Sequence, residues 1–416
     1  MTHDVVRMPY MIGVYLGVNA FPDVFLMVDG PDCLFFKAEY VHGSQDLNST
    51  LLSAVGHHRV VHTLADTVNV VTDREAEVMD LVRRLARQPD AGMVLLTAMP
   101  MAAITGSQYD RIGRLMAREL CKPVVDLPGR SLDGDWLDGY MEVLAAVARG
   151  MPDPAGPPDP EAVAVVGLLL DRTEADRLGD VLEVRRLIEQ GLGLKVAAVW
   201  PSNAPVATLS RALLAGTIVA LPYGRKAASI LASRTGARLV EADLPLGLEA
   251  SAAFVRVLAE ATGRCADRFI AAELERAELA FREVRGRGLE GKRFAVIADP
   301  FLAAGLARAA QDVGATVVAA LSTHYPFRPV ADLPGHEAFR PGLEADLCLT
   351  NTRGIEIAIE LGLPWMEVGF PSYGTHALAT APILGFRGAV RLAERLWNHL
   401  EFLKSWSCPP RTPKIR

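Results

Sequence analysis

Residues 162–199 read AVAVVGLLLDRTEADRLGDVLEVRRLIEQGLGLKVAAV. An apolar run at Ala162–Leu170 leads into an amphipathic segment at Arg177–Gln190, and a second apolar run follows at Lys195–Val199. A strand, a helix and a strand in this order form a crossover unit whose two strands lie parallel in one sheet. The stretch therefore predicts an α/β fold, with a parallel sheet flanked by helices.

The same alternation recurs along the whole chain. Half of the 416 residues are hydrophobic and only 6% are aromatic, which is typical of Ala-, Val- and Leu-rich parallel strands and the helices that cover them. Further strands are expected at Val24–Val28, Met93–Leu96, Phe294–Ile297, Thr316–Leu321 and Asp346–Leu349. Further helices are expected at Glu75–Arg87, Ala252–Ala261, Ala303–Val313 and Ile355–Leu361.

Two breaks divide the chain into domains. The stretch 151–160 holds five prolines in ten residues and reads as a linker. A long charged helix at 266–289 ends in glycines before the next strand. We therefore expect three Rossmann-like domains, at 1–150, 161–265 and 290–404, joined by the linker and by the connecting helix, with a tail at 405–416.

Charge and hydropathy exclude several classes of function. The net charge is −6 and the arginines are dispersed, so no basic stripe indicates nucleic-acid binding. No apolar run reaches the roughly 18 residues that a membrane-spanning helix needs. The first residues, MTHDVVRMPYMIG, do not have the basic and apolar regions of a secretory signal. A cytoplasmic protein is expected.

The five cysteines are widely spaced: Cys33, Cys121, Cys265, Cys348 and Cys408. No C-x-x-C pair occurs, which argues against a self-contained zinc or iron–sulfur site and against a disulfide framework. Cys121 and Cys348 border strands and are expected to fill the core. A metal site that used one of these thiols would need its other ligands from elsewhere.

Two motif-like stretches carry little functional signal. The segment Gly286–Lys292 matches most of a P-loop, but Arg293 occupies the Ser/Thr position and the segment precedes a strand instead of following one. His57, His58 and His62 include two imidazoles four residues apart, which share a metal only if the segment is helical. The β-branched residues there favour a strand, so metal binding remains the weaker alternative.

Cys33 is the candidate ligand. It follows the strand at Val24–Val28 and a Gly30-Pro31 turn, and in open α/β sheets ligands bind outside the carboxyl ends of the strands. A lone cysteine is most often a small buried hydrophobe, so the residues alone leave both interpretations open.

The surrounding sequence resembles a known family. The stretches GVYLGVNAFPDVFLMVDGPDC (13–33), ARLVEADLPLGLEASAAFVRVLAEATG (237–263) and ADLCLTNTRGIEIAIELGLPWMEVGFPSYG (345–374) are similar, in this order, to nitrogenase component-1 subunits and to dark-operative protochlorophyllide and chlorophyllide reductase subunits. The resemblance runs through nearly the whole chain. It implies three Rossmann-like domains and an oxidoreductase subunit that is active in a heteromer.

The resemblance implies an iron–sulfur site with one ligand from this chain. Cys33, in the turn with Gly30 and Pro31, would bind a [4Fe-4S] or related cluster shared at a subunit interface, with Asp32 in reserve. Pro9 or Tyr10, and Met99, stand where the family has its other thiols. One thiolate does not hold such a cluster, so a homologous three-cysteine partner is implied, in a heterodimer or an α2β2 heterotetramer. A separate P-loop, ATP-dependent iron–sulfur reductase would supply electrons.

The same resemblance bears on the substrate. The large metallocluster of nitrogenase would be anchored near Pro222 and Gly369, and neither residue binds metal, so nitrogen fixation by this chain is not expected. Ser372, Tyr373 and His376 are the candidate residues facing a small-molecule substrate. Two other functions stay open, namely a scaffold for cofactor assembly and a structural subunit in which Cys33 is inert.

Overall fold

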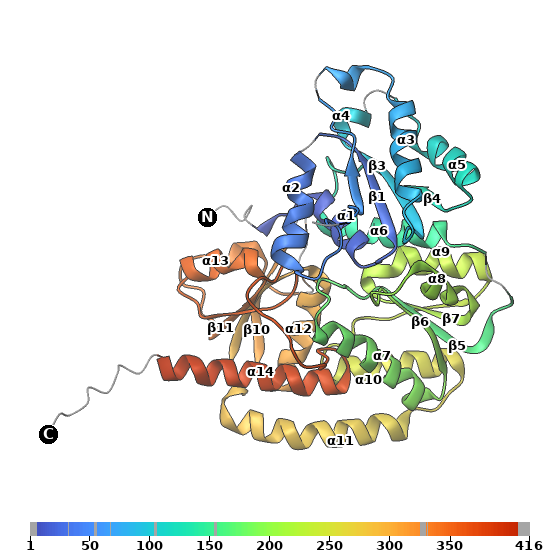
Figure 1. Ribbon diagram of the computed structural model, residues 1–416. Coiled ribbons are helices and arrows are strands. Elements are labelled where there is room, and N and C mark those ends of the chain that lie inside the picture. The colour runs from blue at the N-terminus through green and yellow to red at the C-terminus, as the bar shows by residue number, and fades with distance from the viewer. Residues whose placement is uncertain are drawn as a thin grey trace.

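The computed structural model describes residues 6–31, 33–53, 56–66, 68–103, 106–153, 156–324, 330 and 332–406. Within these ranges the strands form three parallel four-stranded sheets flanked by helices, which confirms the predicted fold class (Figure 1). Each sheet repeats one topology, in which the first strand in sequence pairs with the second and the third, and the fourth lies at the edge. A right-handed crossover between parallel strands produces this order.

The strands of each sheet come from one stretch of the chain, and each sheet with the helices that flank it is called below the first, second or third domain. The first sheet has the order β2-β1-β3-β4, the second β6-β5-β7-β8 and the third β10-β9-β11-β12. Their bounds are β1 Val24–Asp29, β2 Val60–His62, β3 Met93–Ala98, β4 Val124–Asp126, β5 Asp159–Val166, β6 Lys195–Trp200, β7 Ala215–Ala220, β8 Arg238–Glu241, β9 Arg293–Ala298, β10 Thr316–Ser322, β11 Leu347–Thr350 and β12 Trp365–Glu367.

Helices cover both faces of the sheets and fill the space between them. All five amphipathic helices predicted from the sequence are present. The helices are α1 Tyr10–Asn19, α2 Cys33–Glu39, α3 Glu75–Ala86, α4 Pro100–Ala103, α5 Tyr109–Leu120, α6 Trp136–Gly150, α7 Ala175–Leu192, α8 Val206–Leu209, α9 Arg225–Thr235, α10 Leu248–Thr262, α11 Asp267–Val284, α12 Pro300–Asp312, α13 Ile355–Glu360 and α14 Gly385–Trp406.

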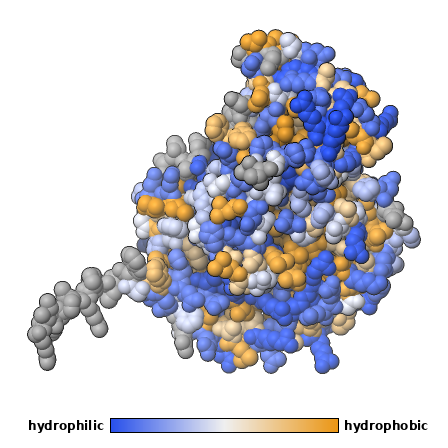
Figure 2. All heavy atoms as spheres, viewed as in Figure 1, coloured by the Kyte–Doolittle hydropathy of each residue, from blue (hydrophilic) through white to orange (hydrophobic). Residues whose placement is uncertain are grey.

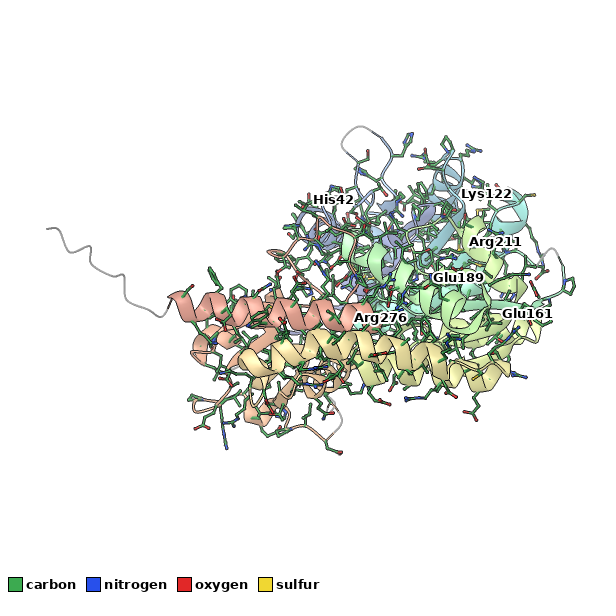
Figure 3. The ribbon with its side chains drawn as sticks, turned by 90° about the horizontal axis from the view of Figure 1, so that it is seen from below. His42, Lys122, Glu161, Glu189, Arg211 and Arg276 are labelled. Atoms are coloured by element: carbon green, nitrogen blue, oxygen red, sulfur yellow. The ribbon has the colours of Figure 1, made fainter. Side chains whose placement is uncertain are left out.

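Two long helices join the second and third sheets. α11 leads from one sheet to the other, and α14, at the end of the described chain, runs beside it and also packs on α7 (Figure 3). The C-terminal helix therefore covers elements of the second domain, although it follows the third sheet in sequence. In the described ranges, no helix is long and apolar enough to cross a membrane.

Several sequence-based expectations differ from the structure. The strand expected at Ala162–Leu170 ends at Val166 because Gly167 adopts φ 115° and its backbone abuts Gly224. β5 begins at Asp159, inside the stretch expected as a linker. Cys121 does not fill the core: it is exposed at the end of α5. Cys348 is buried in β11, as expected.

The first domain is built around the contact of α1 with α6. Every residue of α1 is buried, and its backbone touches that of α6. A Cβ atom on Gly13 would lie 1.5 Å from the carbonyl oxygen of Trp136, and one on Gly139 would lie 2.2 Å from that of Tyr10. Only glycine permits this approach, because any side chain would force the helix backbones apart.

Gly13→Ala should therefore destabilise the protein by about 3 kcal/mol, since the added methyl group meets rigid backbone. The measurement is the free energy of unfolding in urea. Gly43→Ala is the matched control, because a Cβ at Gly43 meets nothing within 4 Å. Equal stability of the two variants would mean that α1 and α6 are not in backbone contact.

Candidate functional site

The carboxyl end of β1 is held by a buried aspartate. Asp29 accepts hydrogen bonds from Thr63 Oγ1 (2.6 Å) and from the hydroxyl of Tyr109 (2.7 Å), and it pairs with Arg74 at 3.1 Å. Thr63 Oγ1 in turn accepts a hydrogen bond from the backbone N–H of Gly30 at 3.0 Å. A buried ion pair with this many hydrogen bonds fixes the backbone at the start of the turn into α2.

The positions that the resemblance matched to cluster ligands lie at this edge of the first sheet. Met99 follows β3, and its N–H donates to the carbonyl oxygen of Asp29 at 2.8 Å. Ser131 Oγ donates to Met99 Sδ at 3.6 Å, and Ser131 lines a cavity of about 340 Å³ together with Pro9. Cys33 begins α2 four residues after Asp29. Parallel strands bring all of these segments to one edge.

Part of the predicted ligand set lies outside the described residues. Asp32 is not described, and of Cys33 only the backbone is described. Cys408, which was not a candidate ligand, also lies outside the described residues. Gly30 and Pro31 are described, and they form the turn between β1 and α2. Ser131 was not predicted, because a serine in a Gly- and Pro-rich loop carries no motif. The ligand roles of Cys33 and Asp32 stay predictions.

The histidine alternative finds no support in the described chain. His62 ends β2, and its Nε2 lies 3.1 Å from the hydroxyl of Tyr15, while His58 Nδ1 accepts a hydrogen bond from the N–H of Ser53. Burial, and then the charge of Lys37, lowers the pKa of His62 to about 4, so this ring is neutral near pH 7.

Among the described residues, the carboxylates and imidazoles that gather closely enough to share a metal ion are Asp135, Asp138 and His324. The two aspartates already form the capping box of α6. Their position is thus explained by helix capping.

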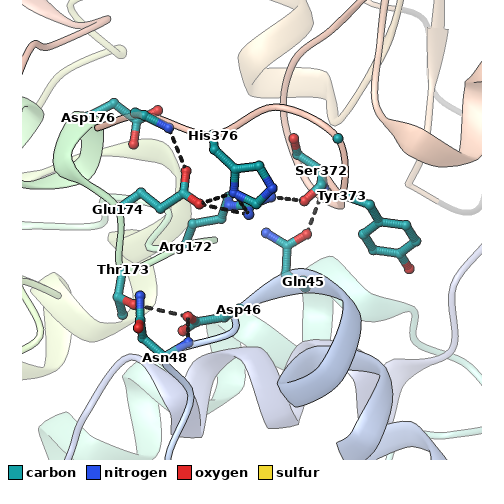
Figure 4. A network of polar contacts seen from close by, with 12 residues as sticks. Gln45, Asp46, Asn48, Arg172, Thr173, Glu174, Asp176, Ser372, Tyr373 and His376 are labelled. Carbon is teal, nitrogen blue, oxygen red and sulfur yellow. Dashed lines mark hydrogen bonds and ion pairs between the residues drawn. The ribbon is translucent and has the colours of Figure 1, made fainter. Parts of the chain in front are cut away.

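The loop that holds Ser372, Tyr373 and His376 lies where the three domains meet (Figure 4). Gln45, from the π-helical turn η2 (Tyr40–Gln45), accepts a hydrogen bond from the N–H of Ser372 and donates one to the carbonyl oxygen of Asp171, both at 2.6 Å. One side chain of the first domain thereby links the other two domains. Ser372 contributes through its backbone.

Three polar and charged side chains, those of Arg172, Glu174 and His376, contact one another at the same junction. Arg172 donates to the carbonyl oxygen of Ser372 and lies 2.9 Å from His376 Nδ1. Glu174 lies 2.6 Å from the same nitrogen and accepts a hydrogen bond from the N–H of Ala377 at 2.9 Å. Burial raises the pKa of Glu174, but the hydrogen bonds from Ala377 and His376 together with Arg172 outweigh it, so the net shift of the pKa is downward.

Tyr373 packs against the first domain. Its ring meets that of Tyr40 edge to face, with centroids 5.6 Å apart, and its N–H donates to Glu367 Oε1 at 2.9 Å. Ser372 is buried, Tyr373 is half-buried and His376 is exposed, so the substrate-facing role of these residues stays a prediction. Gln45, Asp171, Arg172 and Glu174 were missed because long-range polar pairs leave no local pattern in the sequence.

A small cavity of about 30 Å³ lies between the second and third sheets. Gly369 lines it, as does Tyr223, which follows Pro222 in the chain. Gly369, one of the two positions compared with nitrogenase's metallocluster anchors, therefore lies at this cavity, and Pro222, the other, directly precedes a residue that lines it. The cavity has room for about two water molecules. Leucines fill the surrounding space, among them Leu168, Leu169, Leu170, Leu244, Leu246 and Leu302.

Comparison with known proteins agrees with this architecture. The profile of the family described as nitrogenase component 1 type oxidoreductase matches residues 11–401. This chain belongs to that family. A solved structure titled nitrogenase Cp1 at pH 6.5 superimposes with a TM-score of 0.79 at 15% identity, over 97% of this chain and 94% of that one.

Curated relatives of this nitrogenase component-1-type chain include nitrogenase beta chains. The iron-iron protein beta chain of Rhodobacter capsulatus is 31% identical over 207 residues, which cover 44% of this chain and 45% of that relative. The molybdenum-iron protein beta chain of Methanococcus maripaludis is 22% identical over 86% of this chain and 88% of its own length. A light-independent protochlorophyllide reductase polypeptide of a Methylobacterium is 28% identical over 79% of this chain and 69% of its own length.

The environment of His62 predicts a pH dependence. Its folded pKa of about 4 lies below the ordinary value of 6.5, so the unfolded chain binds the extra proton in this window. The contribution of His62 to the free energy of unfolding is therefore fully present above pH 6.5. It is lost as the pH falls toward 4, by up to about 3 kcal/mol. His62→Gln should reduce this loss in urea unfolding between pH 4 and 7. Exposed His57→Gln should not, and equal slopes in both variants would contradict a neutral, half-buried His62.

Proposed function

We propose that this chain is one subunit of a two-component reductase and supplies a single thiolate, Cys33, to an iron–sulfur cluster shared with a homologous partner. The observation that supports this most strongly is the place of Cys33 in the fold. It follows β1 at the carboxyl edge of the first sheet, where Asp29 at the end of β1 accepts a backbone hydrogen bond from Met99 after β3. Ligand sites in α/β folds form at such edges.

The residues at this edge fit a shared cluster and do not fit a complete one. Iron–sulfur clusters are held by several thiolates. Met99 and Pro9, which lie at the edge, are not thiolates, and Cys121, Cys265 and Cys348 belong to other elements. Of the cysteines whose backbone is described, Cys33 alone stands at this edge, and we take it as the donor, with Asp32 as the reserve oxygen donor. The remaining ligands would come from a three-cysteine partner.

Exposed apolar side chains beside this edge support a partner there. The carbonyl oxygen of Gly30 accepts a hydrogen bond from the N–H of Ala65, so the segment that leads into η3 (Asn69–Val71) lies next to the turn. The first domain forms the upper lobe of the molecule in Figure 2, and hydrophobic residues are visible at its tip, at the top of the view. The apolar edge consists of Phe36, Leu64, Val68 and Val71, which are between 61% and 80% exposed. Large exposed apolar side chains near one another in the fold favour an interaction surface.

The cluster would supply single-electron transfer, and this chain would position it. Asp29 and its hydrogen-bond partners hold the backbone at the start of the turn, and this would fix the position of the Cys33 backbone. A ligand held by a rigid backbone keeps its geometry, and outer hydrogen bonds adjust the potential of such a site. Electrons would come from a separate ATP-dependent iron–sulfur reductase. The substrate would be a small molecule, with Tyr373 and His376 nearest to it.

Cys33→Ala should remove the cluster from the co-purified complex while the fold survives, because a cluster iron loses its ligand and a turn residue contributes little to stability. The measurements are iron content and electron paramagnetic resonance. Cys121→Ala and Cys265→Ala are the matched controls, since both are exposed free thiols. An unchanged signal in Cys33→Ala would make Cys33 a packing residue and the chain a structural subunit.

The partner surface has its own test. Val68→Asp with Val71→Asp should weaken heteromer formation at least about tenfold, because charges on a buried apolar patch must be desolvated. The dissociation constant can be measured by analytical ultracentrifugation. Leu279→Asp is the control, since Leu279 is 60% exposed but lies on α11, away from this lobe. Unchanged association of the double variant would place the partner on another face.

A further inference from the structure

The C-terminal helix α14 carries three arginines in one row. Arg387, Arg391 and Arg395 are four residues apart, a spacing that puts successive side chains on one face of a helix, one turn after another. α14 packs on α7, which belongs to the second domain (Figure 1). Arg387 is exposed, whereas Arg391 and Arg395 are half-buried. The last two arginines of the row are therefore partly withdrawn from water.

Arg391 and Arg395 differ from the other arginines that are buried or half-buried. Elsewhere in the described chain, every such arginine has a hydrogen bond or an ion pair, as Arg186 has with Glu183 and Glu273. Arg391 and Arg395 form neither with any described residue, and Nε of Arg391 is a buried donor without an acceptor. This pair of guanidinium groups is thus left without a partner from the described chain.

The charges around the pair leave it with an excess of positive charge. Burial lowers the pKa of Arg395, the carboxylate of Asp176 raises it, and the guanidinium groups of Arg391 and Arg177 lower it again, so the net shift is downward. Arg177 already has two aspartate partners. Asp176, in the first turn of α7, forms no ion pair with a described arginine. Two positive side chains therefore share the field of one carboxylate, which pairs with neither.

Unpaired guanidinium groups at this depth cost free energy, because their N–H donors lose water without gaining an acceptor. Arginine binds the oxygens of carboxylate and phosphate groups through two parallel N–H bonds, a geometry that lysine does not offer. We propose that Arg391 and Arg395 form a binding site for a small oxyanion, a phosphate or carboxylate group, where α14 packs on α7. The oxyanion would supply the acceptors that the chain does not.

An anion bound there would join α14, which follows the third sheet, to α7 of the second domain. Asp176 lies two residues after Glu174, whose carboxylate contacts His376 and the N–H of Ala377 at the domain junction (Figure 4). The site therefore adjoins this junction through the first turn of α7. It uses no residue of the edge at Cys33, so it depends neither on the proposed cluster nor on the partner subunit.

Urea unfolding of the full chain with added oxyanion tests the site. Sodium phosphate at pH 7 should raise the urea midpoint until the effect saturates, relative to sodium chloride at equal ionic strength, because a ligand of the folded state stabilises it. Sodium succinate in a parallel series shows whether the site prefers carboxylate. A saturable response to either anion supports the proposal, and the anion with the lower half-saturation concentration identifies the class of ligand.

Arg395→Met separates a binding role from a structural one. Without oxyanion the variant should be at least as stable as wild type, because an apolar side chain replaces an unpaired charge. Its affinity for the anion, measured by isothermal titration calorimetry, should fall at least about tenfold, since charge-assisted hydrogen bonds are lost. Arg387→Met is the matched control, an exposed arginine of the same row that should keep the response.

Three results would overturn the proposal. A wild-type midpoint that neither phosphate nor succinate moves would mean that water alone solvates the two arginines. An equal response in Arg395→Met would place the anion elsewhere on the chain. A variant less stable than wild type in the absence of oxyanion would mean that Arg395 stabilises the fold without a ligand.

Discussion

The contact of α6 with each of the three domains holds the molecule together. Its face at Gly139 meets the backbone of α1 in the first domain. Trp136, at its start, donates to the carbonyl oxygen of Thr323 in the third domain, and its ring packs on that of Phe370, 4.9 Å away. The hydroxyl of Tyr140, one turn later, joins the backbone of Leu168 in the second domain. Because one helix reaches all three sheets, the edges and loops between them have fixed relative positions.

This rigidity matters because the candidate sites are made of parts from distant stretches of sequence. The edge of the first sheet combines the turn after β1, the start of the loop after β3 and the loop before α6. The domain junction depends on Gln45, which hydrogen-bonds to backbone atoms of both other domains. The hydrogen bonds of Gln45 at this junction join residues of this chain. The edge of the first sheet carries the apolar edge residues and the single proposed ligand Cys33, and a partner subunit would complete that site.

The sequence predicted the fold well, because apolar periodicity records which residues are buried. The fully buried runs Val24–Asp29 and Met93–Ala98 are apolar except for Asp29 and Thr97, which stand at or next to their ends. The sequence-based prediction was wrong where a tertiary contact overrides the local sequence pattern. The apolar run through Leu170 stops being a strand at Gly167, whose backbone meets Gly224 from another element. Cys121 looks like a core residue in sequence, but it ends α5 in the left-handed conformation at the surface.

The sites were predictable only as positions along strands. The place of Cys33 follows from the strand and turn that precede it, and parallel topology brings Met99 to the same edge. The polar junction around Arg172, Glu174 and His376 was not predictable, because its partners are about 200 residues apart and no local spacing links them. The same holds for the pairing of Tyr223 with Asp299, which only the assembled fold creates.

The central claim is that this chain supplies one ligand of a cluster that it does not hold alone. Anaerobic purification of the chain by itself, and of the chain co-expressed with a homologous three-cysteine subunit, tests it most directly. The isolated chain should be folded and almost free of iron, while the heteromer should contain about one cluster per pair, as the ligand arithmetic requires. Stoichiometric iron on the isolated chain, or a heteromer without iron, would contradict the account.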